Sequence, residues 1–164
     1  AILLGSGLAL LIHIGGSVEP HLQWLKLEDG ELVALGPDED APASVVAEVS
    51  GTMYYAAAPA LLDRIARELP EGVTQLVVDV SHAHQLRFAA LEGFERLQGE
   101  LAARGVDLVL AGVSPPFARA LAKGRSQLVF VPRLATPGRS ARRALGGLGR
   151  TQDVAPGATP DAGG

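Results

Sequence analysis

The chain has no cysteine among its 164 residues, and aromatic residues make up only 4% of it. Without cysteine there is no disulfide framework, no thiolate metal site and no cysteine nucleophile. The absence also favours, weakly, a reducing compartment. Apolar residues at 48% and charged residues at 20% lie near the globular average. The composition therefore predicts one folded domain and excludes a wholly disordered chain.

Acidic residues are absent from one long stretch. Residues 117–150 hold eight bases and no acid, whereas residues 1–48 hold eight acids and one base, Lys26. Such a basic stretch suits nucleic acid or anionic lipid head groups. Most of these bases lie beyond residue 132, where no aromatic side chain is present to stack on bases. We therefore expect no nucleic-acid partner.

No apolar run is long enough to span a bilayer, which takes about 20 residues. Residues 1–14 carry no fixed charge and show no amphipathic stripe, and Gly15 and Gly16 follow them. We interpret residues 1–16 as the end of a transmembrane helix, with His13 near the interface; a core helix of a globular domain is the alternative. Because the first residue is Ala1, we expect a fragment of a longer protein.

Residues 17–43 are predicted to be a linker. Asp29-Gly30 is a favoured pair for a tight turn and predicts a short hairpin within it. A second hairpin is expected to open the folded domain, with strands at 45–49 and 52–55 and a turn at Ser50-Gly51.

Strands and helices then alternate. Helical spacing of apolar residues predicts helices over 57–69, 86–104 and 114–122. Near-continuous apolar runs predict buried strands over 75–80, 107–111 and 128–131. This alternation indicates an α/β fold with a mostly parallel sheet, an initial hairpin and helices packed on it. We expect the domain to cover residues 44–132 and residues 133–164 to be a disordered basic tail rich in Gly, Pro and Ala.

The order of elements resembles the STAS domain of SulP-type anion transporters and of bacterial anti-sigma-factor antagonists. The strongest stretch is 74–124, where residues 75–81 (QLVVDVS) resemble the family's central strand and residues 101–113 (LAARGVDLVLAGV) its helix-to-strand junction. Residues 45–58 (VVAEVSGTMYYAAA) resemble the opening strand of the transporters. The apolar segment 1–14 lies where the last transmembrane helix of a SulP transporter would end.

The resemblance implies a regulatory or structural domain on the cytoplasmic side of a membrane, with no catalytic residues and no cofactor. It would dock against the transport domain of the same chain or against a second copy in a homodimer. The implied class is a secondary transporter of sulfate or bicarbonate. The alternative is a free-standing signalling module of the antagonist type. In that type a Ser or Thr near the start of the next helix is phosphorylated, but the aligned position here is Ala89.

Four polar residues follow the first buried strand, where open α/β sheets bind ligands. Ser81, His82, His84 and Arg87 form the candidate partner-binding loop, and Ser81 is the hydroxyl nearest to the missing phosphoacceptor. A small hydrolase using Ser81 and His84 is a further alternative, although the nucleophile-elbow motif is absent. Two histidines are too few ligands for a metal site.

Overall fold

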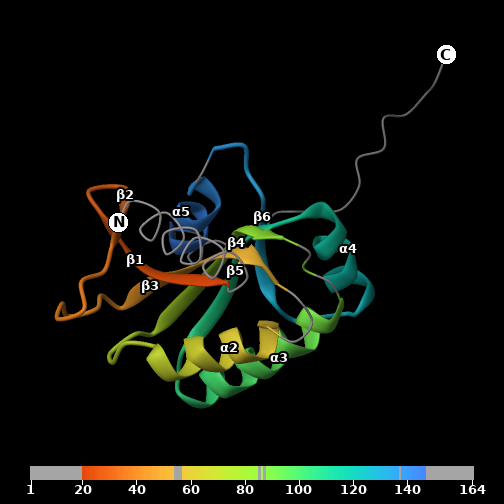
Figure 1. Ribbon diagram of the computed structural model, residues 1–164, viewed down its shortest axis with the longest axis horizontal. Helices are drawn as coiled ribbons and strands as arrows, with labels where there is room; N and C mark the ends of the chain where they lie inside the picture. Colours follow the sequence, from red (N-terminus) through yellow and green to blue (C-terminus); the bar gives the residue numbers. More distant parts are fainter. Residues whose placement is uncertain (1–19, 54–56, 85, 87, 137, 147–164) are drawn as a thin grey trace, which may run out of the picture.

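Strands and helices alternate along the chain from residue 44, as the sequence predicts (Figure 1). The computed structural model describes residues 20–53, 57–84, 86, 88–136 and 138–146. Six strands form one sheet in the order β2-β1-β3-β4-β5-β6. Their bounds are β1 His21–Glu28, β2 Glu31–Ala34, β3 Ser44–Thr52, β4 Gln75–His84, β5 Asp107–Val113 and β6 Val129–Pro132. The helices are α2 Ala57–Glu68, α3 Phe88–Ala103, α4 Pro115–Lys123 and α5 Arg139–Gly146.

Four neighbouring strands, β3 to β6, are parallel, and β1 and β2 add an antiparallel edge. The predicted α/β fold with a mostly parallel sheet is confirmed. At its centre Leu76 of β4 lies opposite Leu108 of β5. Both residues are almost fully buried, because helices cover the sheet on both faces.

The larger core lies between the sheet and helices α2, α3 and α4. The apolar residues at helical spacing in α2 and α3, and Leu69 directly after α2, are buried: Ala58, Leu61, Leu62, Ile65, Leu69, Ala90, Leu91, Phe94, Leu97 and Leu101. The rings of Phe94 in α3 and Phe117 in α4 lie 6.2 Å apart, which is within the range of a favourable aromatic pair. Helical periodicity therefore predicted this layer correctly.

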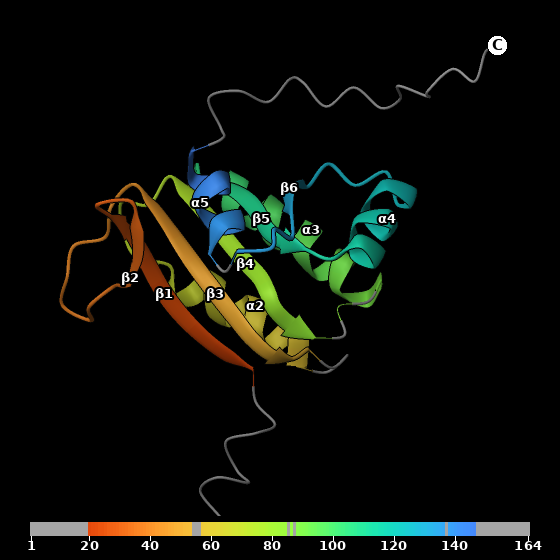
Figure 2. The same cartoon turned by 90° about the horizontal axis from the view of Figure 1, so that it is seen from above.

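The opposite face of the sheet is covered by α5 (Figure 2). Its Ala141 and Ala144 are buried against Val46, Val77 and Val109 of three strands. The sequence placed this segment in a disordered tail from residue 133, and for residues 139–146 that prediction is wrong. Small alanines, rather than large apolar residues, let the helix approach the sheet closely, so the segment buries surface without a hydrophobic run.

The predicted turn at Ser50-Gly51 is absent, because β3 runs without a break from Ser44 to Thr52. Gly51 adopts a positive φ of 101° inside the strand, a backbone conformation that residues with a side chain disfavour. Gly51 therefore allows β3 to continue through this backbone conformation and does not form a turn.

The hairpin at Asp29-Gly30 is confirmed. Asp29 and Gly30 have φ angles of 49° and 83°, as a tight two-residue hairpin turn with two positive φ angles requires. However, β1 also pairs with β3, so the hairpin extends the sheet. The backbone groups along the edge of β3 form hydrogen bonds with β1. Residues 21–34 thus belong to the domain and not to a linker ahead of it.

No helix within the described ranges is long and apolar enough to cross a membrane. The predicted membrane segment 1–16 lies outside those ranges.

Candidate functional site

Three of the four predicted partner-binding residues lie in a strand. β4 continues to His84, so Ser81, His82 and His84 are strand residues and not loop residues. The extension follows from β3, which supplies partners as far as Thr52. Arg87 lies outside the described residues, as does the side chain of Ala89.

A β-bulge interrupts the pairing of β4 with β3. Glu48 lies opposite Asp79 and Ser50 lies opposite His82, so β4 has one residue more than β3 in this stretch. Within the bulge the Ser81 amide donates a hydrogen bond of 2.9 Å to Asp79 Oδ1. The Asp79 side chain is buried, with 1% of its residue surface exposed. Its role in this structure is to hold the bulge.

The bulge shifts the alternation of side chains along β4. Val78, Val80 and Ala83 all pack into the larger core. Because neighbouring residues in a strand point to opposite faces, His82 and His84 lie on the α5 side of the sheet. Both histidines are exposed. A regular strand would have placed His82 on the same face as Val80, so the bulge brings the pair onto one face.

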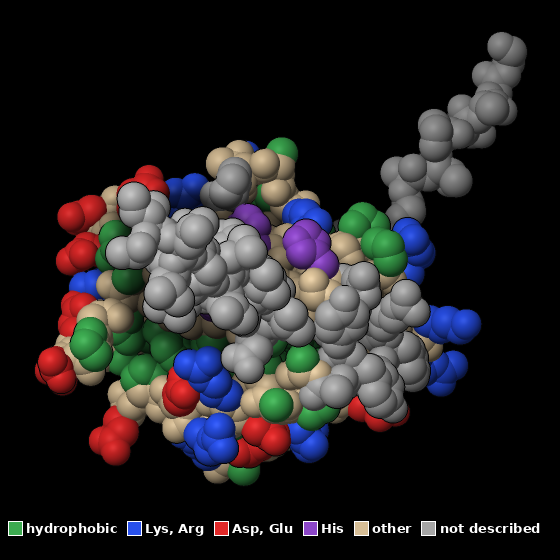
Figure 3. All heavy atoms as spheres, viewed as in Figure 1, with side chains coloured by type: hydrophobic (Ala, Val, Ile, Leu, Met, Phe, Trp, Pro, Cys, Tyr) green, Lys and Arg blue, Asp and Glu red, His purple; other side chains and the backbone are tan. Residues whose placement is uncertain are grey.

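Two further strands add polar residues to this face. His21 of β1 lies opposite Ser50, which lies opposite His82, and Thr52 lies opposite His84. We call His21, Ser50, Thr52, His82 and His84 the polar strip. Histidine side chains are visible near one another on the face shown in Figure 3. Sequence reasoning missed His21 and Ser50, although alternation along the predicted hairpin strand could have identified His21.

Ser81 lies beside the strip and faces β5. A Cβ atom on Gly112 would lie 2.7 Å from the Ser81 amide nitrogen, so the two strands touch here. Among the described residues, no hydrogen bond joins the Ser81 hydroxyl to a histidine. In the same part of the chain, no group of three or more His, Asp or Glu is placed to hold a metal ion. The geometry supports binding through exposed imidazoles and hydroxyls.

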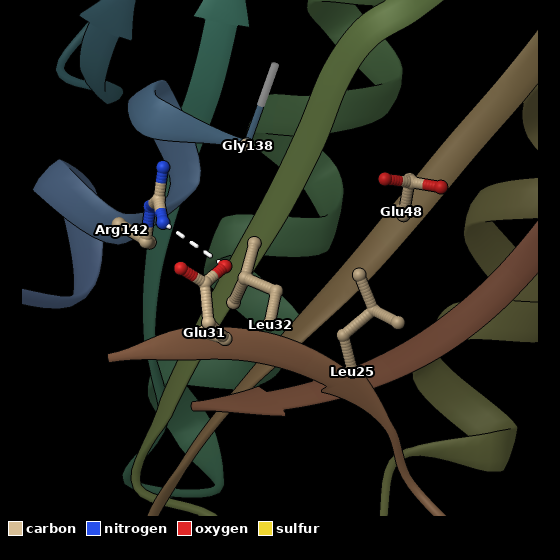
Figure 4. A pocket seen from close by; sticks show the side chains of 6 residues that line it. All are labelled: Leu25, Glu31, Leu32, Glu48, Gly138 and Arg142. Atoms are coloured by element: carbon tan, nitrogen blue, oxygen red, sulfur yellow. Dashed lines mark hydrogen bonds and ion pairs between the residues drawn. The ribbon is translucent and has the colours of Figure 1, made fainter. Parts of the chain in front are cut away.

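A hollow of about 330 Å³ lies on the same face, between the hairpin and α5. It is lined by Leu25, Glu31, Leu32, Glu48, Gly138 and Arg142. Figure 4 shows Arg142 of α5 and Glu31 of β2 pointing toward one another. Their ion pair of 3.3 Å joins the helix to the hairpin, and Arg142 also donates to the Gly30 carbonyl at 3.4 Å. These contacts hold α5 against the edge of the sheet.

A family model described as the STAS domain matches residues 37–135 of this chain. No curated protein sequence matches the chain.

One similar structure is the murine Solute Carrier 26 family member A9 (Slc26a9) anion transporter in the inward-facing state, with a TM-score of 0.56 and 13% sequence identity. The match covers 81% of this chain and 24% of the transporter, so the matched part spans about a quarter of that protein's length. A second is the STAS domain of an antisigma-factor antagonist from Rhodobacter sphaeroides, at 14% identity and a TM-score of 0.41. That match covers 58% of this chain and 88% of the antagonist domain. At these identities the transporter likeness establishes the fold alone.

Proposed function

This chain belongs to the STAS domain family, and from that premise we propose that it is the cytoplasmic regulatory or structural domain of a SulP-type secondary anion transporter. The anion would be of the sulfate or bicarbonate class. Residues 1–16 would end the last transmembrane helix, and the domain would influence anion movement without carrying out chemistry itself.

The observation that carries this proposal is the position of the polar strip. The described chain enters the sheet at His21, and His21 lies next to Ser50 and His82 in the pairing of β1, β3 and β4. The apolar segment 1–14 ends seven residues before His21. A transport domain attached through that segment would therefore be close to the strip.

Exposure supports the same assignment. His21, His82 and His84 are exposed, while α5 covers the same face farther along the strands, over Val46, Val77 and Val109. Imidazoles and hydroxyls offer hydrogen-bond donors and acceptors to a polar protein surface. We propose that the strip, with Ser81 beside it and Arg87 just beyond β4, docks against the transport domain or against a second copy of the chain.

The fold comparison is compatible with this arrangement. The match to the mouse transporter covers 81% of the chain, which is more than the 37–135 segment of the family model.

Expression of the complete gene product tests the proposal. We expect the protein in the membrane fraction, and we expect deletion of the whole domain, residues 21–146, to reduce uptake of labelled sulfate or bicarbonate. Residues 21–146 expressed alone serve as the control and should show no uptake. A complete gene product that stays out of the membrane fraction and moves no anion would support the antagonist-type signalling module instead.

A further inference from the structure

A second hollow, of about 610 Å³, lies on the outer side of α5. Leu134, Arg139, Arg142 and Arg143 line it. Three of its four lining residues are thus arginines, and no acid lines it. The hollow is shallow and open to solvent, and its lining is cationic.

The helix that carries these arginines is held firmly to the sheet. Ser140 is buried; its hydroxyl donates to the Pro132 carbonyl at 3.1 Å and accepts from the Leu134 amide at 3.0 Å. At the other end of α5, Gln75 Nε2 of β4 donates to the Ala144 carbonyl at 3.4 Å. Both clamps fix the helix axis, and the first one also fixes Leu134 at the rim of the hollow. The arginines therefore project from a rigid element.

The positive charge is poorly compensated. Arg139 and Arg143 are exposed, and in the described part of the chain neither forms an ion pair. They are four residues apart on one helix, where like charges lie close together and repel one another. The first turn of α5 contains no acidic residue to balance the helix dipole. An anion in the hollow would relieve both effects.

Arg142 is oriented in advance. Its guanidinium pairs with Glu31 at 3.3 Å, and the same side chain lines the hollow. A guanidinium has five N–H donors, so this contact leaves other donors free for a second acceptor. The contact thus positions one of the three arginines before any ligand binds.

We propose that Arg139, Arg142 and Arg143 bind a phosphate-like oxyanion, either free or as the phosphate group of a lipid. A tetrahedral oxyanion offers several acceptor oxygens, and arginine matches them with paired N–H donors. This site lies apart from the polar strip and does not depend on the chain belonging to a transporter. Because Arg142 also pairs with Glu31 of β2, a bound anion would be linked to the hairpin through this ion pair.

The test is a titration of the full 164-residue chain with inorganic phosphate at constant ionic strength, followed by calorimetry. We expect saturable binding that Arg143→Gln weakens by at least about tenfold, because charge-assisted contacts are lost. Arg119→Gln, which removes one exposed arginine from α4, is the matched control and should weaken binding by less than about twofold. Thermal melting of both variants checks that the fold is retained.

A second arm distinguishes the two sources of phosphate. Vesicles of phosphatidylcholine with phosphatidic acid are compared with vesicles of phosphatidylcholine alone. Binding to the acidic vesicles that free phosphate competes away, and that Arg143→Gln removes, identifies a lipid head group; titration by free phosphate without vesicle binding identifies a free oxyanion. Absence of saturable phosphate binding, or equal weakening by Arg119→Gln, overturns the proposal whether or not the complete protein transports an anion.

Discussion

Gly112 of β5 lies directly against Ser81 of β4, with room for no side chain between them. A Cβ atom at residue 112 would come within 2.7 Å of the Ser81 amide nitrogen and 2.8 Å of its Cα. Gly112 also has a φ of 72°, which disfavours any residue with a Cβ. Ser81 belongs to the bulge that places His82 and His84 on one face. Its close contact with Gly112 therefore helps to hold the backbone of that bulge in place.

We therefore expect Gly112→Ala to lower the free energy of unfolding by about 2 kcal/mol or more, since it adds backbone strain to a steric clash with main-chain atoms. Urea denaturation of the full chain measures the effect. Gly99→Ala is the control: Gly99 is exposed in α3 with open space around it. That substitution should stabilise the helix by about 0.5–1 kcal/mol. Equal stability of the two variants would show that β4 and β5 are not in contact at the bulge.

Leu91 tests the larger core. It is 3% exposed and lies on the inner face of α3. Leu91→Asp buries a charge without a partner and should cost several kcal/mol, roughly 3–5, in unfolding free energy. Glu95→Gln, at an exposed position of the same helix, should change stability by less than about 0.5 kcal/mol. A Leu91→Asp protein that melts at the wild-type temperature would mean that the helix is rotated from the position described.

Ser140 tests the clamp on α5. Removing its hydroxyl by Ser140→Ala leaves the Leu134 amide and the Pro132 carbonyl without this partner, at a cost of about 1–3 kcal/mol. Amide hydrogen exchange should then speed up in residues 139–146 more than in α3. Ser126→Ala, at a partly exposed serine near the start of β6, serves as the control. Unchanged exchange in α5 would mean that the alanines alone hold the helix.

Glu39 lies in the segment between β2 and β3 and forms an ion pair with Lys26 of β1. The Lys26 ammonium and the Gly36 amide, which donates at 3.1 Å, lower the pKa of the Glu39 carboxyl, and Glu39 in turn raises the pKa of Lys26. A lowered carboxyl pKa adds stability that is present above the unfolded value, about 4.3, and is lost as the pH falls through the lower folded value. Glu39→Gln should therefore flatten the acid limb of the stability curve below about pH 4. Identical acid limbs for Glu39→Gln and wild type would argue against the ion pair.

The central sheet and the first helical layer could be predicted from the sequence because their signals are local. Leu76 and Leu108 lie in apolar runs typical of buried parallel strands, and they pair as expected. The stripe from Ala90 to Leu101 has helical spacing and is buried. In both cases the pattern of apolar residues predicts which side of the strand or helix faces the core.

The features that the sequence did not predict depend on partners distant in the chain. Ser50-Gly51 has the composition of a turn, yet pairing with β1 and β4 keeps β3 extended. Ala141 and Ala144 are too small to mark a buried helix by hydropathy, and their burial depends on the sheet surface beneath them. Similarly, the common face of His82 and His84 with Ser50 depends on a bulge that no local pattern indicates.

The measurement that tests the central claim most directly is uptake of labelled sulfate and bicarbonate into vesicles that contain the complete protein. The comparison is between wild type and the double variant His82→Glu with His84→Glu, whose exposed positions should leave stability within about 0.5 kcal/mol of wild type. We predict equal amounts of both proteins in the vesicles and an initial uptake rate for one of these anions that is severalfold lower in the variant. Uptake at the wild-type rate in the variant, or no uptake of either anion by the wild-type protein, would contradict the account.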